Sequence, residues 1–363
     1  MKKALLGTSA IALAGVMAAP ASAAEWDVRV GGYYNAMVAY ASTDGNGVAG
    51  SDFDGLDVST NTEIFFLPSI TLDNGIKIGA NIQLEGETNG DTIDESYVQI
   101  KGSFGEVLIG SENSAGYKMH YAAPNAAIIS LNSPSTGDYI AWSAGRDSVF
   151  RGTLGATYLE VQGNNDAKRI TYFTPRFSGF QLGVSYAHDG NQDNFGPTNI
   201  AGGSGNLAHI FDIGANYVQS FGAINVAISG RYGIGQSNVA AGPDTPTIYS
   251  FGVNLGYAGF TIGGSWAESN EHNAGVDDGI AYDFGMSYAT GPWTFSVTYF
   301  HGENGEAGGT SDEQDTFGAA VDYKLAKGVR LNLFGAYVDL DAAEGAAGDR
   351  DGWVIGTGIG LSF

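Results

Sequence analysis

Large apolar residues alternate with small or polar residues over the last fourteen positions of the chain, 350–363 (RDGWVIGTGIGLSF). The bulky or β-branched side chains of this stretch stand at every second position: Trp353, Ile355, Thr357, Ile359 and Leu361. A period of two places all of them on one face of a β-strand. A tilted strand needs only about 9–11 residues to cross a bilayer. The terminal stretch is therefore predicted to be a membrane-spanning strand and the last element of the chain.

The same alternation recurs along the rest of the sequence and predicts fifteen further strands. They are expected at 25–41, 58–66, 76–84, 97–101, 104–110, 169–174, 180–187, 207–220, 223–235, 247–257, 260–267, 280–289, 293–300, 316–325 and 329–339. Short turns such as Asp73-Asn74-Gly75 alternate with long polar connections. An even number of antiparallel strands closes into a cylinder without edges, as lipid requires. The predicted fold is all-β: a sixteen-stranded antiparallel transmembrane β-barrel, with its first and last strands paired.

Alternation alone fits a soluble β-sandwich as well as a membrane barrel, and the distribution of side chains decides between them. The basic residues in strands oppose the bulky face, and few charges lie among the aromatics. Aromatic residues gather near strand ends, where interfacial girdles are expected: Phe173, Phe177, Phe180, Tyr288, Trp293 and Phe295. In such a barrel Gly356, Gly358 and Gly360 would face the interior and leave that part of the wall bare. These features favour the membrane barrel over ordinary β patterning.

Composition narrows the class of protein further. Charged residues make up only 15% of the 363 positions, whereas about 25% is usual for a soluble protein. After the N-terminal segment no apolar run is long enough for a transmembrane helix. The chain contains no Cys, which excludes disulfide frameworks, thiolate nucleophiles and zinc–thiolate sites.

The N-terminus predicts export. Lys2 and Lys3 precede an apolar region, and Ala21-Ser22-Ala23 forms a small-residue cleavage site, so residues 1–23 are interpreted as a signal peptide and 24–363 as the mature barrel. An N-terminal core helix is the less fitting alternative. Removal of this segment, with two Lys and no acid, changes the net charge from −23 to −25. Such a chain repels nucleic acid, and no nucleic-acid partner is predicted.

Four stretches resemble the general porins of Gram-negative outer membranes, particularly the alphaproteobacterial type. They are Trp26–Tyr34 (WDVRVGGYY), Gly102–Gly110 (GSFGEVLIG), Ile170–Tyr186 (ITYFTPRFSGFQLGVSY) and the terminal strand. The resemblance implies a homotrimer of sixteen-stranded barrels in contact with outer-membrane lipid and lipopolysaccharide. It implies passive diffusion of ions and small hydrophilic solutes through a water-filled channel, with a long third loop folded into the lumen. It also implies that the strand ending in Phe363 is the signal read by the barrel-assembly machinery.

The long stretch 113–166 follows the fifth predicted strand, where the resemblance places the constriction loop. Charges in or beside this loop are Glu112, Lys118, Asp138, Arg146 and Arg151, and candidate wall charges are Arg29, Glu63, Lys77, Lys101 and Arg169. Opposed charges across a narrow gap would set up a transverse field that discriminates ions by sign. The family's PEFGG-like loop core is absent, so the sequence does not show which acids face the gap. Each of these charges could equally be a solvated loop charge with no role in permeation. The acidic mature chain predicts a mild cation preference.

External connections carry much of the negative charge: Glu303, Glu306, Asp312, Glu313, Asp315, Asp339, Asp341, Glu344 and Asp349. Carboxylates suit Ca²⁺ and bridging to lipopolysaccharide phosphates, while plain solubility is the simpler interpretation. No EF-hand spacing is present, and no other cofactor is predicted.

Three alternative functions are open at this stage. A barrel enzyme such as a lipase needs a nucleophile beside a base, and the five His residues form no recognisable Ser/His/acid arrangement, so no enzyme is predicted. A solute-specific channel and an adhesin scaffold differ from a general pore through loop geometry that the sequence does not give.

Overall fold

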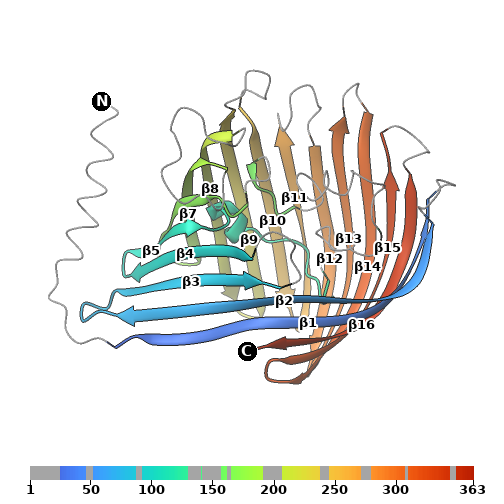
Figure 1. Ribbon diagram of the computed structural model, residues 1–363, viewed down its shortest axis with the longest axis horizontal. Coiled ribbons are helices and arrows are strands. Elements are labelled where there is room, and N and C mark those ends of the chain that lie inside the picture. Colours follow the sequence, from blue (N-terminus) through green and yellow to red (C-terminus); the bar gives the residue numbers. More distant parts are fainter. Residues whose placement is uncertain are drawn as a thin grey trace.

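The chain forms sixteen antiparallel strands arranged as a closed barrel (Figure 1). The strands are β1 Asp27–Asp44, β2 Phe53–Thr71, β3 Lys77–Glu85, β4 Ile93–Gly102, β5 Gly105–Ser111, β6 Lys168–Phe173, β7 Phe180–Asp189, β8 Leu207–Phe221, β9 Ile224–Ser237, β10 Thr247–Tyr257, β11 Phe260–Asn270, β12 Gly279–Thr290, β13 Trp293–Glu306, β14 Thr310–Ala326, β15 Val329–Asp341 and β16 Arg350–Ser362. A five-residue helix, α2 Ala115–Met119, follows β5. The number of strands and their antiparallel order confirm the prediction.

The computed structural model describes residues 25–45, 52–86, 92–129, 140, 157–161, 165–190, 207–237, 245–270, 279–306, 310–343 and 349–363. The predicted signal peptide, 1–23, lies outside these residues. Within them, no helix has the length and apolar character needed to cross a membrane.

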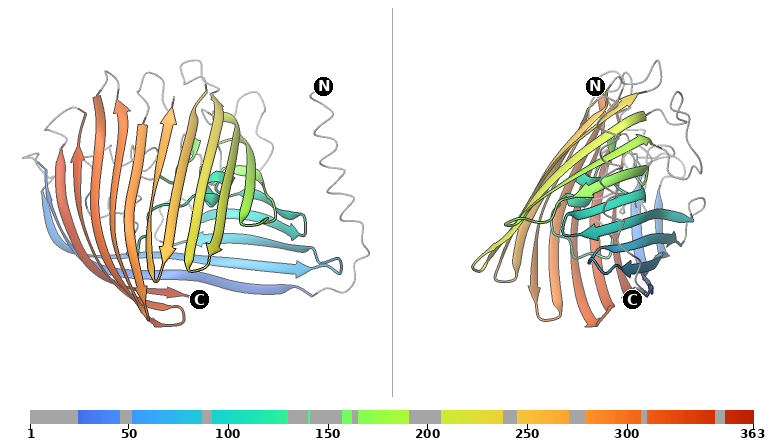
Figure 2. Two further views of the ribbon diagram at one scale, coloured as in Figure 1. Left: turned by 180° about the vertical axis from the view of Figure 1, so that it is seen from behind. Right: turned by 90° about the vertical axis from the view of Figure 1, so that its left-hand side faces the viewer.

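Pairing between the first and last strands closes the sheet. Val38 of β1 lies opposite Thr357 of β16, and the backbones of Gly32 and Phe363 exchange two hydrogen bonds of 3.1 Å. Figure 2 shows the continuous, tilted wall from two further sides. The start of β1 and the end of β16 both lie at the rim that carries the short turns, which we call the short-turn end. The opposite rim is the long-loop end. The predicted pairing of strands one and sixteen is confirmed.

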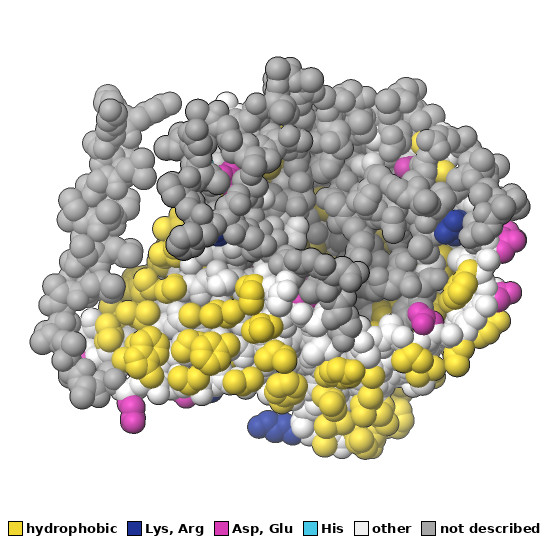
Figure 3. All heavy atoms as spheres, viewed as in Figure 1, with side chains coloured by type: hydrophobic (Ala, Val, Ile, Leu, Met, Phe, Trp, Pro, Cys, Tyr) yellow, Lys and Arg dark blue, Asp and Glu magenta, His cyan; other side chains and the backbone are white. Residues whose placement is uncertain are grey.

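The outer face of the barrel is apolar. Along β1 the exposed large residues are Val28, Val30, Tyr34, Val38 and Tyr40, the face predicted from the alternation. Hydrophobic side chains gather in a broad band across the lower half of the surface in Figure 3. Phe177 and Phe180, at a short turn, are 79% and 44% exposed, which agrees with an interfacial girdle. This outer face can therefore contact lipid.

The inner face is not uniformly polar, which the sequence did not predict. Apolar wall residues and residues of the segment after β5 form a buried cluster, here named the inner apolar cluster: Met37, Ala39, Ala41, Ala126, Ile129, Ile140, Ala320, Phe334, Ala336, Val338, Leu340, Ala342 and Val354. The prediction that Phe173 belongs to an aromatic girdle is wrong, because its ring points inward and packs with Leu108 and Met119. Part of the wall therefore serves as a packing surface for chain inside the barrel.

The expectation that the glycines of the terminal strand leave the wall bare is also wrong. A Cβ at Gly356 would overlap the ring of Phe334, and one at Gly358 would lie 3.0 Å from Cγ of Met37 and 3.1 Å from Cδ1 of Ile128. The glycines face inward as predicted. Larger neighbouring side chains fill the space that they leave.

Several acids predicted in external connections belong to strands instead. β13 continues to Glu306 and β14 begins at Thr310, so Glu303, Glu313 and Asp315 take part in cross-strand pairs. Strand predictions ended too early there because these polar stretches lack bulky residues, yet the backbone ladder continues. Asp312 points inward and is buried, and it accepts a 2.8 Å hydrogen bond from the backbone of Ala343.

The tight contact at Gly356 predicts a specific loss of stability. Gly356→Val should lower the free energy of unfolding by about 1–3 kcal/mol, because the new side chain displaces Phe334 from the inner apolar cluster. Urea unfolding of the folded barrel in detergent measures the change. The matched control is Gly335→Val on β15, where a Cβ would meet only the carbonyl oxygen of Val354 at 3.5 Å. An equal loss in both variants would contradict the packing argument.

Candidate functional site

The chain that follows β5 runs along the inner face of the barrel wall. Its backbone N–H groups donate to inward side chains of successive strands. The bonds from Ala115, Tyr121, Ala126 and Ile128 to Ser185 on β7, Ser229 on β9, Ser296 on β13 and Asn332 on β15 are 3.1, 2.9, 2.9 and 3.0 Å long. A non-regular segment needs such acceptors because its peptide groups lack a sheet or helix partner. The wall therefore supplies a line of acceptors that guides this segment around the lumen.

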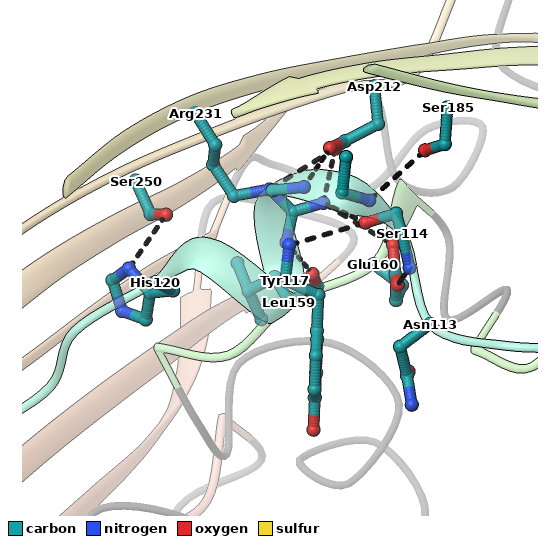
Figure 4. Close-up of polar contacts among 12 residues, drawn as sticks. Asn113, Ser114, Tyr117, His120, Leu159, Glu160, Ser185, Asp212, Arg231 and Ser250 are labelled. Atoms are coloured by element: carbon teal, nitrogen blue, oxygen red, sulfur yellow. Dashed lines mark hydrogen bonds and ion pairs between the residues drawn. The ribbon is translucent and has the colours of Figure 1, made fainter. Parts of the chain in front are cut away.

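A buried arginine ties both ends of the segment to the wall (Figure 4). The Arg231 side chain, on β9, is 1% exposed and forms an ion pair with Asp212 of β8 and a second, 3.3 Å long, with Glu160. It also donates to Oγ of Ser114 at 3.0 Å and to the carbonyl oxygen of Leu159. Residues on both sides of the long loop thus share one guanidinium. Its fork of N–H donors suits several acceptors at once.

The two carboxylates of this network have further partners in the loop. Glu160 accepts a 2.6 Å hydrogen bond from the backbone N–H of Ser114, and Asp212 accepts from the backbone N–H of Gly116. Buried charges are tolerated only when they are paired and hydrogen-bonded. The network meets that condition, and it fixes α2 against β8 and β9.

Farther along the loop, His120 also contacts the wall, and its side chain is neutral. Burial, followed by the charge of Arg231, lowers the pKa of His120 to about 3. Its two ring nitrogens lie 3.2 Å from Oγ1 of Thr157 and 3.3 Å from Oγ of Ser250. A neutral ring that joins two hydroxyl groups is a structural link between the loop and β10.

Carboxylates gather at the root of the loop. Glu112, 1% exposed, forms a 2.7 Å ion pair with Lys118, and Glu95 of β4 accepts a 2.8 Å hydrogen bond from Asn113. Burial, and next the charge of Asp94, raise the pKa of Asp166 to about 7. Negative charge at this point is therefore costly, and Lys118 offsets only part of it.

The structure brings together some of the predicted site residues. Glu112 and Lys118 are in contact, as described above. Arg169 is buried at the start of β6 and donates from Nε to the carbonyl oxygen of Ala167 at 3.1 Å. Glu63 is a buried, inward residue of β2. Asp138, Arg146 and Arg151 lie outside the described residues, so their place in the constriction stays a prediction.

The predicted basic wall lies elsewhere. Arg29 pairs with Asp27 at 3.2 Å at the start of β1, and Lys101, opposite Lys77, lies 3.7 Å from Glu106. The Lys101–Glu106 pair is five residue pairs from Ser111, where the loop begins, or about 16 Å along the strand. These three cations therefore line the short-turn end and not the root of the loop. Their effect on permeation stays a prediction.

Sequence reasoning missed Arg231, Asp212 and Asp283 as site residues. Asp283 of β12 accepts the backbone N–H of Ala123 through both carboxylate oxygens, at 3.1 and 3.2 Å. The sequence did contain a signal for an inward position, since each of the three is a charged residue in mid-strand on the face opposite the bulky residues. Their loop partners are remote in the sequence, and alternation carries no information about them.

The acidic residues predicted in the external connections do not form a metal site in the described part of the chain. No group of three or more His, Asp or Glu side chains there is arranged to hold a metal ion. Ca²⁺ binding stays a prediction from the sequence.

Known proteins resemble this chain in sequence and in fold. A family model described as Gram-negative porin matches residues 7–343. Outer membrane porin protein 32 of Delftia acidovorans is 30% identical over 208 residues, which are 53% of this chain and 51% of that protein. The chain thus spans about half the length of this curated relative in the match. A protein of Rickettsia conorii with no assigned function is 24% identical over 337 residues, 74% of this chain and 75% of that protein.

Two solved structures show the same fold. An anion-selective porin from Comamonas acidovorans has a TM-score of 0.62 and 19% identity, and covers 93% of this chain and 100% of its own. The trimer form of OmpT from Vibrio cholerae has a TM-score of 0.61 and 12% identity, with coverage of 93% and 99%. At these identities the likeness establishes the fold alone.

Loss of the buried guanidinium should release the loop. Arg231→Gln leaves Asp212 and Glu160 buried without their cation, so the free energy of unfolding should fall by about 3–5 kcal/mol, as measured by urea unfolding in detergent. Arg29→Gln is the control, since its exposed ion pair should contribute less than about 1 kcal/mol. Equal stability of the Arg231→Gln variant and the unmodified chain would refute the anchoring role.

The raised pKa of Asp166 predicts a pH dependence. Its folded-state pKa of about 7 exceeds the ordinary value of 3.8, so the folded barrel binds the proton more tightly than the unfolded chain. Stability should therefore fall as pH rises from about 4 to 7. Asp166→Asn should be more stable than the unmodified chain by about 1–4 kcal/mol at pH 8 and equal to it at pH 4. Asn also accepts the positive φ of 55° at this position.

Urea unfolding at both pH values measures this difference, with Asp54→Asn at an exposed position of β2 as the control. A gain for Asp166→Asn that is the same at pH 4 and pH 8 would rule out proton binding at Asp166 as the cause.

Proposed function

Because this chain belongs to the Gram-negative porin family, we propose that it forms a water-filled channel for the passive diffusion of ions and small hydrophilic solutes. The family and the barrel fold indicate the outer membrane as its location. The observation that carries the proposal is a closed barrel with an apolar outer face and a lumenal cavity of about 880 Å³, whose lining includes charged, amide and hydroxyl side chains as well as apolar ones. Water and small solutes can occupy such a space, whereas lipid contacts the outside.

The segment after β5 is the proposed constriction. Its described residues occupy the inner face from β7 to β15, and two kinds of contact hold them there. Backbone hydrogen bonds to wall side chains, together with the Arg231 network, fix the polar part, and the inner apolar cluster holds Ala126 and Ile129. A loop anchored at so many points narrows the channel without blocking it by random motion. Solutes would then pass on the side that the loop leaves open.

A mild preference for cations is the second part of the proposal. The mature chain predicted from the sequence carries a net charge of −25, and a lumen with a net negative potential raises the local concentration of cations. Two inward acids, Glu63 on β2 and Glu95 on β4, lie next to the neutral side chains of Tyr33 and Asn113.

Assembly and location complete the proposal. We propose a homotrimer, which is supported by the trimer form of the similar Vibrio cholerae barrel, with outer-membrane lipid and lipopolysaccharide around it. Phe363, 67% exposed at the end of the closing strand, suits recognition by the barrel-assembly machinery. Export through residues 1–23 belongs to the same proposal.

Planar-bilayer recordings test the proposed function. Purified, folded protein should add stepwise conductance in KCl, because each insertion opens an aqueous path. Under a tenfold KCl gradient the reversal potential should have the sign set by K⁺. The same protein unfolded by boiling is the control and should add no steps. Folded protein that never conducts would contradict the channel function, and a reversal potential with the sign set by Cl⁻ would contradict only the ion preference.

A further inference from the structure

The lumenal cavity has a chemically uneven lining. It is bounded by Tyr33 and Asn35 of β1, by β2, by the end of β3, by β14 to β16, and by Ile128 and Ile129 of the loop. Its two cations are Lys324 and Arg330, both on the wall made by β14 and β15. Two carboxylates also line it: Glu85 at the end of β3, and Asp322 of β14 on the same wall as the two cations.

Lys324 and Arg330 are direct cross-strand partners. Like charges opposite each other destabilise a sheet, so this pair carries a cost in the empty barrel. Its compensation is weak. Nη1 of Arg330 lies 3.6 Å from Oδ2 of Asp322, beyond hydrogen-bonding distance, and that oxygen already accepts from Asn332 at 3.1 Å. Lys324 is exposed, and in the described part of the chain its ammonium group makes no ion pair.

Four residues form a row across four neighbouring strands and include the cationic pair. Asn35, Gly360, Arg330 and Lys324 are consecutive cross-strand partners on β1, β16, β15 and β14. A Cβ at Gly360 would lie 2.8 Å from Nε of Arg330 and 2.9 Å from Oδ1 of Asn35. Both side chains thus extend over the glycine, which gives them room to lie side by side. Asn35, Arg330 and Lys324 therefore bring a carboxamide, a guanidinium and an ammonium group to the lining of one cavity.

The loop adds an apolar surface to the same cavity. Ile128 and Ile129 line it together with Met37, and the backbone N–H of Ile128 is held by Oδ1 of Asn332 at 3.0 Å. Asn332 is two residues from Arg330 on the same inward face. The apolar surface is therefore fixed next to the cationic pair.

We propose that this cavity is a binding subsite for small aliphatic monocarboxylates. Lys324 and Arg330 bind the carboxylate, since charge-assisted hydrogen bonds to these groups are the strong ones. Asn35 adds an amide donor, and Met37, Ile128 and Ile129 contact the aliphatic chain. The subsite rests on the proposed channel function and gives the channel a preferred solute class. A net acidic channel would otherwise disfavour this class.

Current block by valerate in planar bilayers tests the subsite. Single-channel current in NaCl should fall saturably as sodium valerate is added, and pentanamide, its neutral analogue, should have little effect. Acetate should need a higher concentration than valerate, because it lacks the chain that contacts Ile128. The double variant Lys324→Gln/Arg330→Gln should raise the half-saturation concentration of valerate about tenfold or more. Arg330→Lys, which keeps the charge, should retain most of the effect.

Lys327→Gln is the control for the loss of a positive charge near the cavity but outside its lining. It removes one positive charge from the turn between the same two strands, at a residue that does not line the cavity, and it should leave the half-saturation concentration within about twofold. Heat-modified electrophoretic mobility verifies that each variant is folded. An unchanged valerate response in the double variant, or an equal response to pentanamide, would overturn the subsite while NaCl current still supports the channel. Absence of NaCl current in the unmodified chain would overturn both.

Discussion

Every other feature of this structure depends on the need to hydrogen-bond backbone groups that lie in a bilayer. An unpaired N–H or C=O group in hydrocarbon costs several kcal/mol, so a spanning sheet cannot keep a free edge. The pairing of β1 with β16 meets this requirement, down to the two bonds between Gly32 and the final residue, Phe363. Closure in turn divides the side chains of each strand into an outer and an inner set. The apolar outer face and the lumen are two consequences of the same constraint.

Closure also creates a wall that other parts of the chain can use as a partner. The segment after β5 has no sheet of its own, and its peptide groups bond to Ser229, Ser296 and Asn332. The buried Arg231 side chain contacts Ser114 at the start of the loop and Glu160 at its end. Apolar wall residues fill the gaps left by small ones, as Phe334 does beside Gly356. The described residues of the loop are thus fixed against the inner face of the wall, and the row from Asn35 to Lys324 borders the cavity beside them.

The sequence predicts the wall far better than it predicts the interior. A period of two is a local property, so strand number, strand order and the outward residues of β1 follow from it. The ends of the strands are predicted less well, because polar strand ends, such as those that contain Glu303 and Asp315, have no alternating bulky residues. Interior contacts depend on residues far apart in the chain: Arg231 meets Ser114 only after the barrel has closed. Predicted charges such as Lys77 and Arg29 face inward correctly, but their height along the barrel depends on register and tilt, which alternation does not contain.

The first and last strands meet in one register and thereby close the barrel. The chain has no Cys, so a pair of introduced cysteines reports on this contact alone. Val38→Cys with Thr357→Cys are direct partners, and their Cβ atoms should lie about 4.5–5.5 Å apart, near disulfide range. Val38→Cys with Ile359→Cys lie on the same face but are separated diagonally by about 7–8 Å. Under mild oxidation the first pair should cross-link in the folded protein and the second should not. Preferential cross-linking of the second pair would contradict this register, and cross-linking of neither pair would contradict closure by β1 and β16.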